Sequence, residues 1–253
     1  MNLISVDIGN SAMKFGFRRT DGEFVRVRIE SSADIEFHDQ LPAEPCFWPI
    51  CSVDSQNAES LIAWISEHRP NDEYHLIKAD DVPLSSEVNS REQLGRDRLV
   101  AAWHAAGMFS DDREVIIIDA GTAVTIDKVD RKGTFQGGVI YPGARSCLRL
   151  LADSTSQLPD LTDGKLSAKE IAASPIGKNT EMAILRGIYQ AQMAAFQSIV
   201  KNMSDNCHVV ATGGEVEFVQ DFLPSDWHVE PFLVLLAVRE LGKLLLDERA
   251  NES

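Results

Sequence analysis

The chain has 253 residues and a formal net charge of −15, and 44% of its residues are hydrophobic. This composition is typical of a folded globular protein with a substantial core, built as one large domain or two smaller ones. The negative charge disfavours nucleic acid or an anionic membrane as the main partner, so we expect neither. An anionic substrate would have to meet local positive charge, for which Lys14 and Arg98 are candidates.

The first residues enter an apolar strand directly, without the basic region and long apolar segment of a secretory signal. No apolar run is long enough to cross a bilayer. The four cysteines form no Cys-x-x-Cys pair, which favours buried thiols in a reducing compartment over a zinc site. We therefore expect a cytoplasmic protein.

Two stretches of the chain share one pattern, in which an apolar run is followed by Asp, any residue, Gly, a small polar residue and a second apolar run. The first stretch is 4–14, ISVDIGNSAMK, and the second is 116–125, IIIDAGTAVT. One copy alone is more often an ordinary turn. Because the pattern is repeated between two strands each time, it predicts a duplicated fold.

The chemistry of the two turns suits a nucleotide. Each glycine permits a tight turn, and the small side chains of Asn10, Ser11 and Thr122 leave the backbone N–H groups open to an anion. Asp7 and Asp119 would add two carboxylates. Together these groups could hold a nucleotide triphosphate and its Mg²⁺, because the metal needs oxygen ligands and the phosphates need donors.

The first half of the chain predicts three short strands followed by alternating strands and helices. We expect strands at 3–7, 12–19, 23–29, 46–53 and 74–78 and a helix at 55–68. Pro49 counts against a regular ladder in the fourth strand. Residues 80–95 form a long loop, which is often functional. It leads into a helix near Asp97, which either caps that helix or is a carboxylate held over a cleft.

The second half restarts the pattern. We expect strands at 114–119, 122–129, 134–141 and 207–211 and helices at 144–152, 180–203, after Gly214 and at 232–247, with a loop-rich stretch at 153–178. Gly137 and Gly138 would let another group approach the third strand closely. The apolar face of 180–203 indicates core or dimer packing.

These elements predict an α/β protein of two duplicated ribonuclease H-like domains of βββαβα type, with the active site in the cleft between them. We place the domains at 1–110 and 111–253.

At this point the chain resembles a known family, the type III pantothenate kinases of the acetate/sugar kinase and actin superfamily. The resemblance covers nearly the whole chain, and the Gly-x-Asp-Arg motif points beyond a generic ATPase. The motifs that carry it are Asp7-Ile8-Gly9-Asn10-Ser11 with Lys14, Gly95-Arg96-Asp97-Arg98, Asp119-Ala120-Gly121-Thr122-Ala123, Gly137-Gly138 with Tyr141-Pro142-Gly143, Ile176-Gly177-Lys178-Asn179-Thr180, and Thr212-Gly213-Gly214.

The resemblance implies phosphorylation of pantothenate by ATP to 4′-phosphopantothenate, the first step of coenzyme A biosynthesis. It implies Asp97 as the general base and the residues Gly95, Arg96, Arg98 and Thr180 as contacts of pantothenate. The ATP and phosphate contacts would be Asp7, Ile8, Gly9, Asn10, Ser11, Lys14, Thr122, Thr212, Gly213 and Gly214, with Asp7 also near Mg²⁺. Asp119 matches the residue for a monovalent cation, K⁺ or ammonium, and the family is generally a homodimer.

This chain departs from the family pattern before the Gly-x-Asp-Arg motif. The usual Tyr-x-Asn-Pro is replaced by Glu87-Val88-Asn89-Ser90, and Ser11 stands where Thr is usual. Two alternatives therefore stay open. One is a nucleotide-binding regulatory or accessory protein without turnover, since the family includes relatives first described as accessory factors for transcription. The other is a kinase of another small alcohol.

Overall fold

The computed structural model describes residues 1–19, 21–30, 35, 37–162, 175–216 and 223–252. The chain divides into two compact units. Unit 1 comprises Met1–Met108 together with Phe232–Ser253, and unit 2 comprises Phe109–Pro231. No helix among the described residues is both long and apolar enough to cross a membrane.

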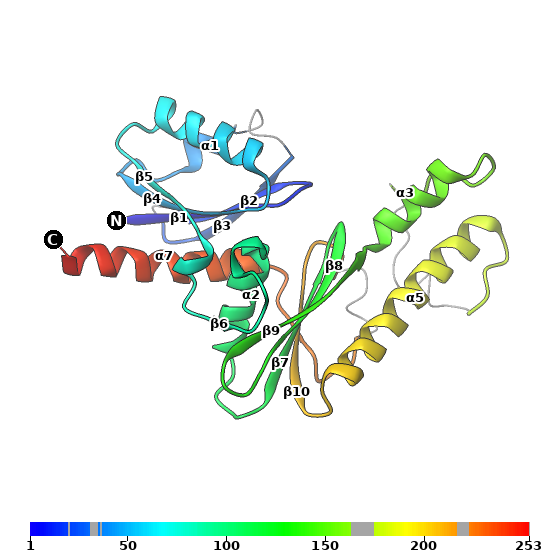
Figure 1. The fold of residues 1–253 in the computed structure, drawn as a ribbon. Helices are drawn as coiled ribbons and strands as arrows, with labels where there is room; N and C mark the ends of the chain where they lie inside the picture. Colours follow the sequence, from blue (N-terminus) through cyan, green and yellow to red (C-terminus); the bar gives the residue numbers. More distant parts are fainter. Residues whose placement is uncertain (20, 31–34, 36, 163–174, 217–222, 253) are drawn as a thin grey trace. The chain divides into compact units, whose positions relative to one another are not determined.

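Unit 1 contains a five-stranded mixed sheet (Figure 1). The strand order is β3-β2-β1-β4-β5, with antiparallel pairing from β3 to β1 and parallel pairing from β1 to β5. The strands are β1 (Asn2–Ile8), β2 (Met13–Arg18), β3 (Phe24–Ile29), β4 (Cys46–Ser52) and β5 (Glu73–Leu76).

Unit 2 repeats this topology. Its strands are β7 (Glu114–Ala120), β8 (Ala123–Val129), β9 (Thr134–Pro142), β10 (Cys207–Thr212) and β11 (His228–Val229). They follow the order β9-β8-β7-β10-β11, again antiparallel for the first three and parallel for the last three. The predicted α/β fold with a duplicated βββ beginning is therefore confirmed.

The helices are α1 (Ser55–His68), α2 (Arg96–Ala106), α3 (Ala144–Ser154), α5 (Thr180–Met203) and α7 (Leu233–Glu252), and a short strand β6 lies at Ser85–Ser86. Short 3₁₀ helices lie at Phe37–Gln40, Ala79–Asp81 and Arg91–Gln93. The bounds of α1 and α5 match the prediction at both ends, because a capping Asp54 or Asn179 precedes each helix. The helix expected after Gly214 falls partly outside the described residues.

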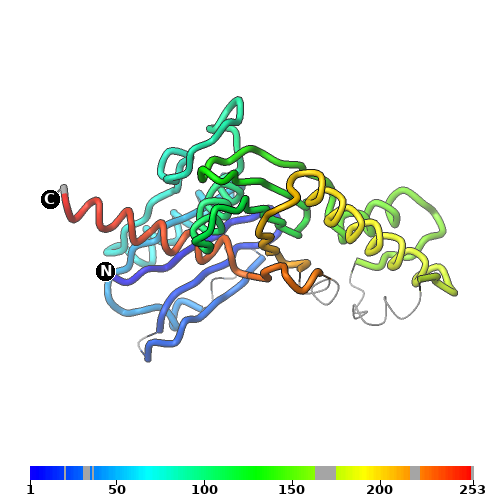
Figure 2. Tube along the Cα trace, turned by 90° about the horizontal axis from the view of Figure 1, so that it is seen from below, coloured from blue at the N-terminus to red at the C-terminus, as the bar shows by residue number. Residues whose placement is uncertain are grey.

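The alternation of side chains along β1 assigns its two faces. Ile4, Val6 and Ile8 are fully buried in the core cluster that includes Leu61 and Ile65 of α1. Their neighbours along the strand, which include Asp7, point to the opposite face. That face is covered by α7, which runs along the sheet in both views (Figures 1 and 2).

The last helix, α7, belongs to unit 1, whereas the predicted domain division placed it in the second domain, 111–253. It packs against β1, β2 and β4 of unit 1 and against α2. The apolar face of the helix is buried in this packing, where Leu233, Leu235, Ala237, Val238 and Leu241 are almost fully buried.

Pro49 does not keep β4 from the middle of the sheet. The strand lies between β1 and β5, and its pairing with β1 skips Trp48 and Pro49 and resumes at Ile50. The missing N–H of proline is accommodated by this gap. Pro49 instead packs its ring against α7, where a side chain on Gly242 would meet it.

We expect Gly242→Val to destabilise unit 1. A Cβ at Gly242 would lie 2.6 Å from Cγ of Pro49 and 3.1 Å from Cδ2 of Leu3. The helix must move away from the sheet, and we expect the free energy of unfolding to fall by about 2 kcal/mol in urea titrations.

The matched control is Gly187→Val, the same change at a helical glycine of α5 whose Cβ position is open. Its effect should stay within about 0.5 kcal/mol, because only helix propensity changes. Equal effects at the two positions would show that α7 does not press on the sheet.

Candidate functional site

Asp7 stands near the end of β1, on the face covered by α7 rather than by α1. It is 5% exposed, and its Oδ2 accepts a hydrogen bond from Nζ of Lys14 at 2.9 Å. The two residues are register partners across β1 and β2. The ion pair therefore holds the Lys14 ammonium beside the first turn.

The turns after Asp7 and Asp119 are each closed by a hydrogen bond from the glycine N–H to a following alanine carbonyl, three residues on in the first turn and two in the second. Gly9 N donates to Ala12 O at 3.0 Å, and Gly121 N donates to Ala123 O at 3.1 Å. Each glycine therefore stands in a tight turn, as expected, but neither residue has a positive φ, so the backbone conformation itself does not require glycine.

A Cβ at either glycine would meet its nearest neighbour only at 3.6 Å, an ordinary contact. Within the described residues the protein itself thus gives no steric reason for glycine at these two positions. The bare backbone remains open to the close approach of a ligand.

Asp97 is the second residue of α2 and is not its N-cap, which is Gly95. The interpretation of Asp97 as the cap is therefore wrong. Its Oδ1 accepts a hydrogen bond from the backbone N of Arg98 at 2.8 Å. A Cβ on Gly95 would lie 2.5 Å from this oxygen, so the glycine makes room for the carboxylate.

Cys51 links the first turn to α2. It is fully buried and is the register partner of Asp7 across β1 and β4. Burial raises the pKa of its thiol well above the usual value, and the carboxylates of Asp7 and Asp97 raise it further. Arg96 and Lys14 oppose this shift. The charges of the Asp7–Lys14 pair and of Asp97 thus all act on this one buried thiol.

The loop before α2 is organised by Arg91. Its guanidinium donates to the carbonyls of Ala79 (2.9 Å), Val82 (2.7 Å) and Leu84 and to Oγ of Ser86 (3.3 Å). The segment 87–90, where the usual Tyr and Pro are missing, lies inside this loop. Arg91 thus gives the loop a defined conformation without those two residues.

The two arginines that flank Asp97 have different surroundings. Arg96 donates through Nη1 to the carbonyls of Glu92 (2.8 Å) and Leu94 (3.0 Å), so it fastens the preceding turn. Arg98 is half-buried in the first turn of α2. Its place beside Asp97 suits contact with an anionic group.

In unit 2, Asp119 lies beside the glycine turn that ends β10. It is the register partner of Thr212, which is 2% exposed. Gly213 has φ +100°, and a Cβ there would collide with Ala120 O and Oδ1 of Asp119. Glycine is therefore required at 213, whereas Gly214 has open space around it. The structure groups Asp119, Thr212 and Gly213, with the exposed Thr122 at the adjoining turn.

Two other predicted positions have local structural roles. The group that approaches Gly138 is the neighbouring strand, since a Cβ there would collide with Ile126 O and Oδ1 of Asp127. Thr180 is the exposed first residue of α5, directly after Asn179, whose side chain accepts from Met182 N at 2.8 Å.

The described residues contain no group of three or more His, Cys, Asp or Glu side chains that could hold a metal. Asp7 and Asp119 are the carboxylates at the two turns.

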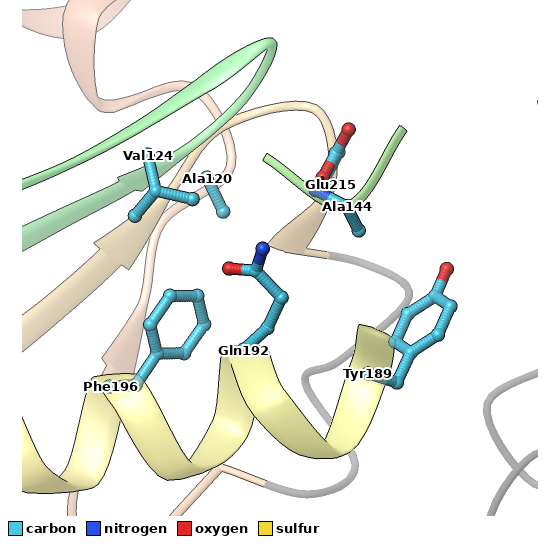
Figure 3. Close-up of a pocket in the computed structure, with 7 residues that line it drawn as sticks. All are labelled: Ala120, Val124, Ala144, Tyr189, Gln192, Phe196 and Glu215. Atoms are coloured by element: carbon cyan, nitrogen blue, oxygen red, sulfur yellow. Dashed lines mark hydrogen bonds between the residues drawn. The ribbon is translucent and has the colours of Figure 1, made fainter. Parts of the chain in front are cut away.

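Figure 3 shows a small pocket of unit 2, into which the amide of Gln192 points. It is lined by Ala120, Val124, Ala144, Tyr189, Gln192, Phe196 and Glu215. Its free volume of about 10 Å³ suits one water and not a nucleotide base. Oε1 of Gln192 is buried there without a partner in the described part of the chain.

Two residues of these clusters were missed from the sequence. The sequence predicts Cys51 only as a buried thiol, which it is, and assigns Glu215 no role. The repeat offered a signal for Glu215. Cys51 pairs with Asp7 and Thr212 pairs with Asp119, and three residues after each of these partners an acidic residue caps a helix. Asp54 does so for α1, and Glu215 does so for α3.

Comparisons with known proteins agree on one family. Residues 3–202 match the family model described as type III pantothenate kinase. The type III pantothenate kinase of Phocaeicola vulgatus is 32% identical over 249 residues, covering 95% of this chain and 97% of that protein. The type III pantothenate kinase of a Sulfurihydrogenibium species is 25% identical over 260 residues, covering 95% and 99%.

Solved structures share the fold. A conserved Baf family protein of Campylobacter jejuni, described as a transcriptional activator, has a TM-score of 0.60 at 17% identity and covers 96% of this chain and 99% of its own. The activator of 2-hydroxyisocaproyl-CoA dehydratase from Clostridium difficile, with bound ADPNP, has a TM-score of 0.52 at 13% identity and covers 98% of both chains.

We expect Gly213→Ala to destabilise unit 2, because the methyl group meets backbone at Ala120 and the residue keeps a positive φ. The loss should be about 2 kcal/mol in urea titrations. Gly214→Ala is the control and should change stability by less than about 0.5 kcal/mol, since its Cβ position is open. A neutral Gly213→Ala would mean that the turn does not press against Asp119.

Proposed function

The chain belongs to the type III pantothenate kinase family, and on that premise we propose that it transfers the γ-phosphoryl group of ATP to the primary hydroxyl of pantothenate, with Asp97 as the general base. The product is 4′-phosphopantothenate, and the reaction is the first step of coenzyme A biosynthesis. The family is shown by the match over 3–202 and by relatives of nearly equal length.

The observation that carries the proposal is the pair of turns after Asp7 and Asp119. In each turn the glycine N–H donates to an alanine carbonyl across the turn, and the surrounding protein does not require the glycine. Phosphate oxygens approach a backbone most closely where no Cβ intervenes. These turns are therefore suited to receive the phosphates of ATP, and Asn10, Ser11 and Thr122 are exposed at them.

We assign to Lys14 the role of stabilising the negative charge on the phosphates. Asp7 holds its ammonium at the first turn by a 2.9 Å contact. An ammonium beside a transferring phosphoryl group stabilises the negative charge that spreads over its oxygens. Mg²⁺, when bound with ATP, neutralises part of that charge, and Asp7 is the carboxylate of unit 1 suited to its vicinity.

Asp97 is suited to accept the proton of the attacking alcohol. It is half-buried in the first turn of α2, and one of its oxygens is held by Arg98 N, which fixes the direction of the carboxylate. A carboxylate fixed in one rotamer is already oriented to act as a general base. Arg98 follows it and could pair with the carboxylate of pantothenate.

The remaining assignments rest on the resemblance alone. Thr180, Gly95 and Arg96 would contact or frame pantothenate, and Ile8, Gly9, Thr212, Gly213 and Gly214 would line the ATP site. Asp119 would hold a monovalent cation, K⁺ or ammonium. We also propose a cytoplasmic homodimer.

We expect Asp97→Asn to lower kcat by about 10²–10⁴-fold, because an amide cannot accept the proton. The KM for ATP should change little. The measurement is ADP release coupled to NADH oxidation, with pantothenate and MgATP. Asp80→Asn, the same change at an exposed aspartate of unit 1, should keep wild-type turnover. Near-normal turnover of Asp97→Asn would refute the general-base assignment.

The second prediction concerns Asp119 and the cation. Turnover of the wild type should rise when K⁺ replaces Na⁺ at equal ionic strength, and Asp119→Asn should remove this difference. Turnover without any K⁺ effect would support the kinase activity and exclude the cation site.

The same assays test the two alternative functions. ATP binding without ADP release on adding pantothenate would favour the regulatory protein, and turnover only with another alcohol would favour a kinase of that alcohol.

A further inference from the structure

Glu215 bridges two segments of unit 2 that lie far apart in the sequence. It follows the turn at Gly213 and Gly214, and Figure 3 shows it beside Ala144. Its carboxylate accepts hydrogen bonds from the backbone N of Ala144 at 2.9 Å and of Arg145 at 3.2 Å. These are the first two residues of α3. The N-cap of α3 is Gly143, which has no side chain to satisfy them.

The backbone of Glu215 contacts the second turn directly. Its N–H donates to Ala120 O at 2.8 Å. Ala120 lies between Asp119 and Gly121, so one residue connects the base of this turn with the start of α3.

The start of α3 is in turn fastened to the far side of the same turn. Gly143 N donates to Thr122 O at 3.0 Å, and Oγ of Ser146 donates to the same oxygen at 2.6 Å. A Cβ at Gly143 would collide with Gly121 O, so the two backbones lie in close contact. The hydrogen bonds thus form a closed ring from Ala120 through Glu215 and α3 back to Thr122.

The charge of Glu215 also decides which donors remain for an anion. A helix N-terminus attracts anions through its exposed N–H groups and its dipole. Here two of those N–H groups already bind the Glu215 carboxylate. A phosphate at this end of the sheet is therefore directed to the turn and away from α3.

We propose that Glu215 is a positioning residue for the nucleotide, which holds the turn of Asp119 to Thr122 in the conformation that receives the phosphates. The inference rests on the proposed function. Burial raises the pKa of Glu215, and the hydrogen bonds from the two backbone amides partly oppose this rise.

The test is the affinity for MgATP in the absence of pantothenate, measured by calorimetry on the full chain. Glu215→Gln keeps the shape but loses the charge and one acceptor, and we expect affinity to fall about tenfold. In turnover assays the KM for ATP should rise by the same factor, while kcat and the KM for pantothenate change less than about twofold. Glu215→Asp, which keeps the charge, should recover part of the affinity.

Asp205→Asn, at an exposed carboxylate of unit 2, is the control and should bind MgATP like the wild type. Hydrogen exchange gives a second readout that does not depend on ATP. In Glu215→Gln the amides of Gly121 and Gly143 should exchange faster, while those of β10 stay protected.

Wild-type affinity with unchanged exchange in Glu215→Gln would overturn the inference. A variant that loses protection throughout unit 2 would also overturn it, because the residue would then support the whole unit and not the turn. Failure of the wild type to bind MgATP would refute the proposed function, and the exchange data would still decide whether Glu215 holds the turn.

Discussion

The parallel strand beside each Asp-x-Gly turn is the constraint on which the rest of the structure depends. Because β4 runs parallel to β1 and β10 runs parallel to β7, the chain leaves neighbouring strands at the same edge of each sheet. Cys51 thus lies beside Asp7, and Thr212 lies beside Asp119. A slip of one residue in β1 would turn Asp7 to the α1 face and remove its pairing with Lys14. In open sheets of this kind, ligands bind outside the carboxyl ends of parallel strands.

The two copies of the motif share the strand–turn–strand arrangement, with a first turn one residue longer than the second, and they differ in chemistry. Lys14 stands opposite Asp7, whereas Thr125 stands opposite Asp119. The ammonium adds positive charge at the first turn, whereas at the second turn the backbone N–H groups are suited to phosphate and the Asp119 carboxylate is suited to a cation. The helix caps differ as well, since Asp54 caps the helix that follows it and Glu215 caps one that begins 71 residues earlier. The two halves thus share one fold and differ in the side chains that stand at the turns and cap the helices.

The local patterns of the sequence were enough to predict the three-stranded beginning of each sheet, the strands β4, β5 and β10 and the helices α1 and α5, but not the short strands β6 and β11. The place of α7 could not be predicted, because an apolar helix shows that it is buried and not which sheet covers it. The position of Cys51 beside Asp7 could not be predicted either, because it follows from the parallel register, which pairs residues 44 positions apart. Similarly, Gly9 and Gly213 look alike in sequence, yet only Gly213 is required by its neighbours. Which glycines serve the fold and which leave room for a ligand is decided by contacts that no local pattern contains.

The return of α7 to unit 1 makes unit 2 an insertion within unit 1 along the chain. During synthesis, residues 109–231 leave the ribosome before α7 does, so unit 2 can complete its sheet first even though unit 1 began earlier. The second face of the unit 1 sheet is covered only after α7, with Leu235 and Leu241, has been synthesised. At translation rates of about 5–20 residues per second, that face stays open to solvent, chaperones and other nascent chains for roughly ten seconds or more. The order in which the units mature is thus the reverse of the order in which they start.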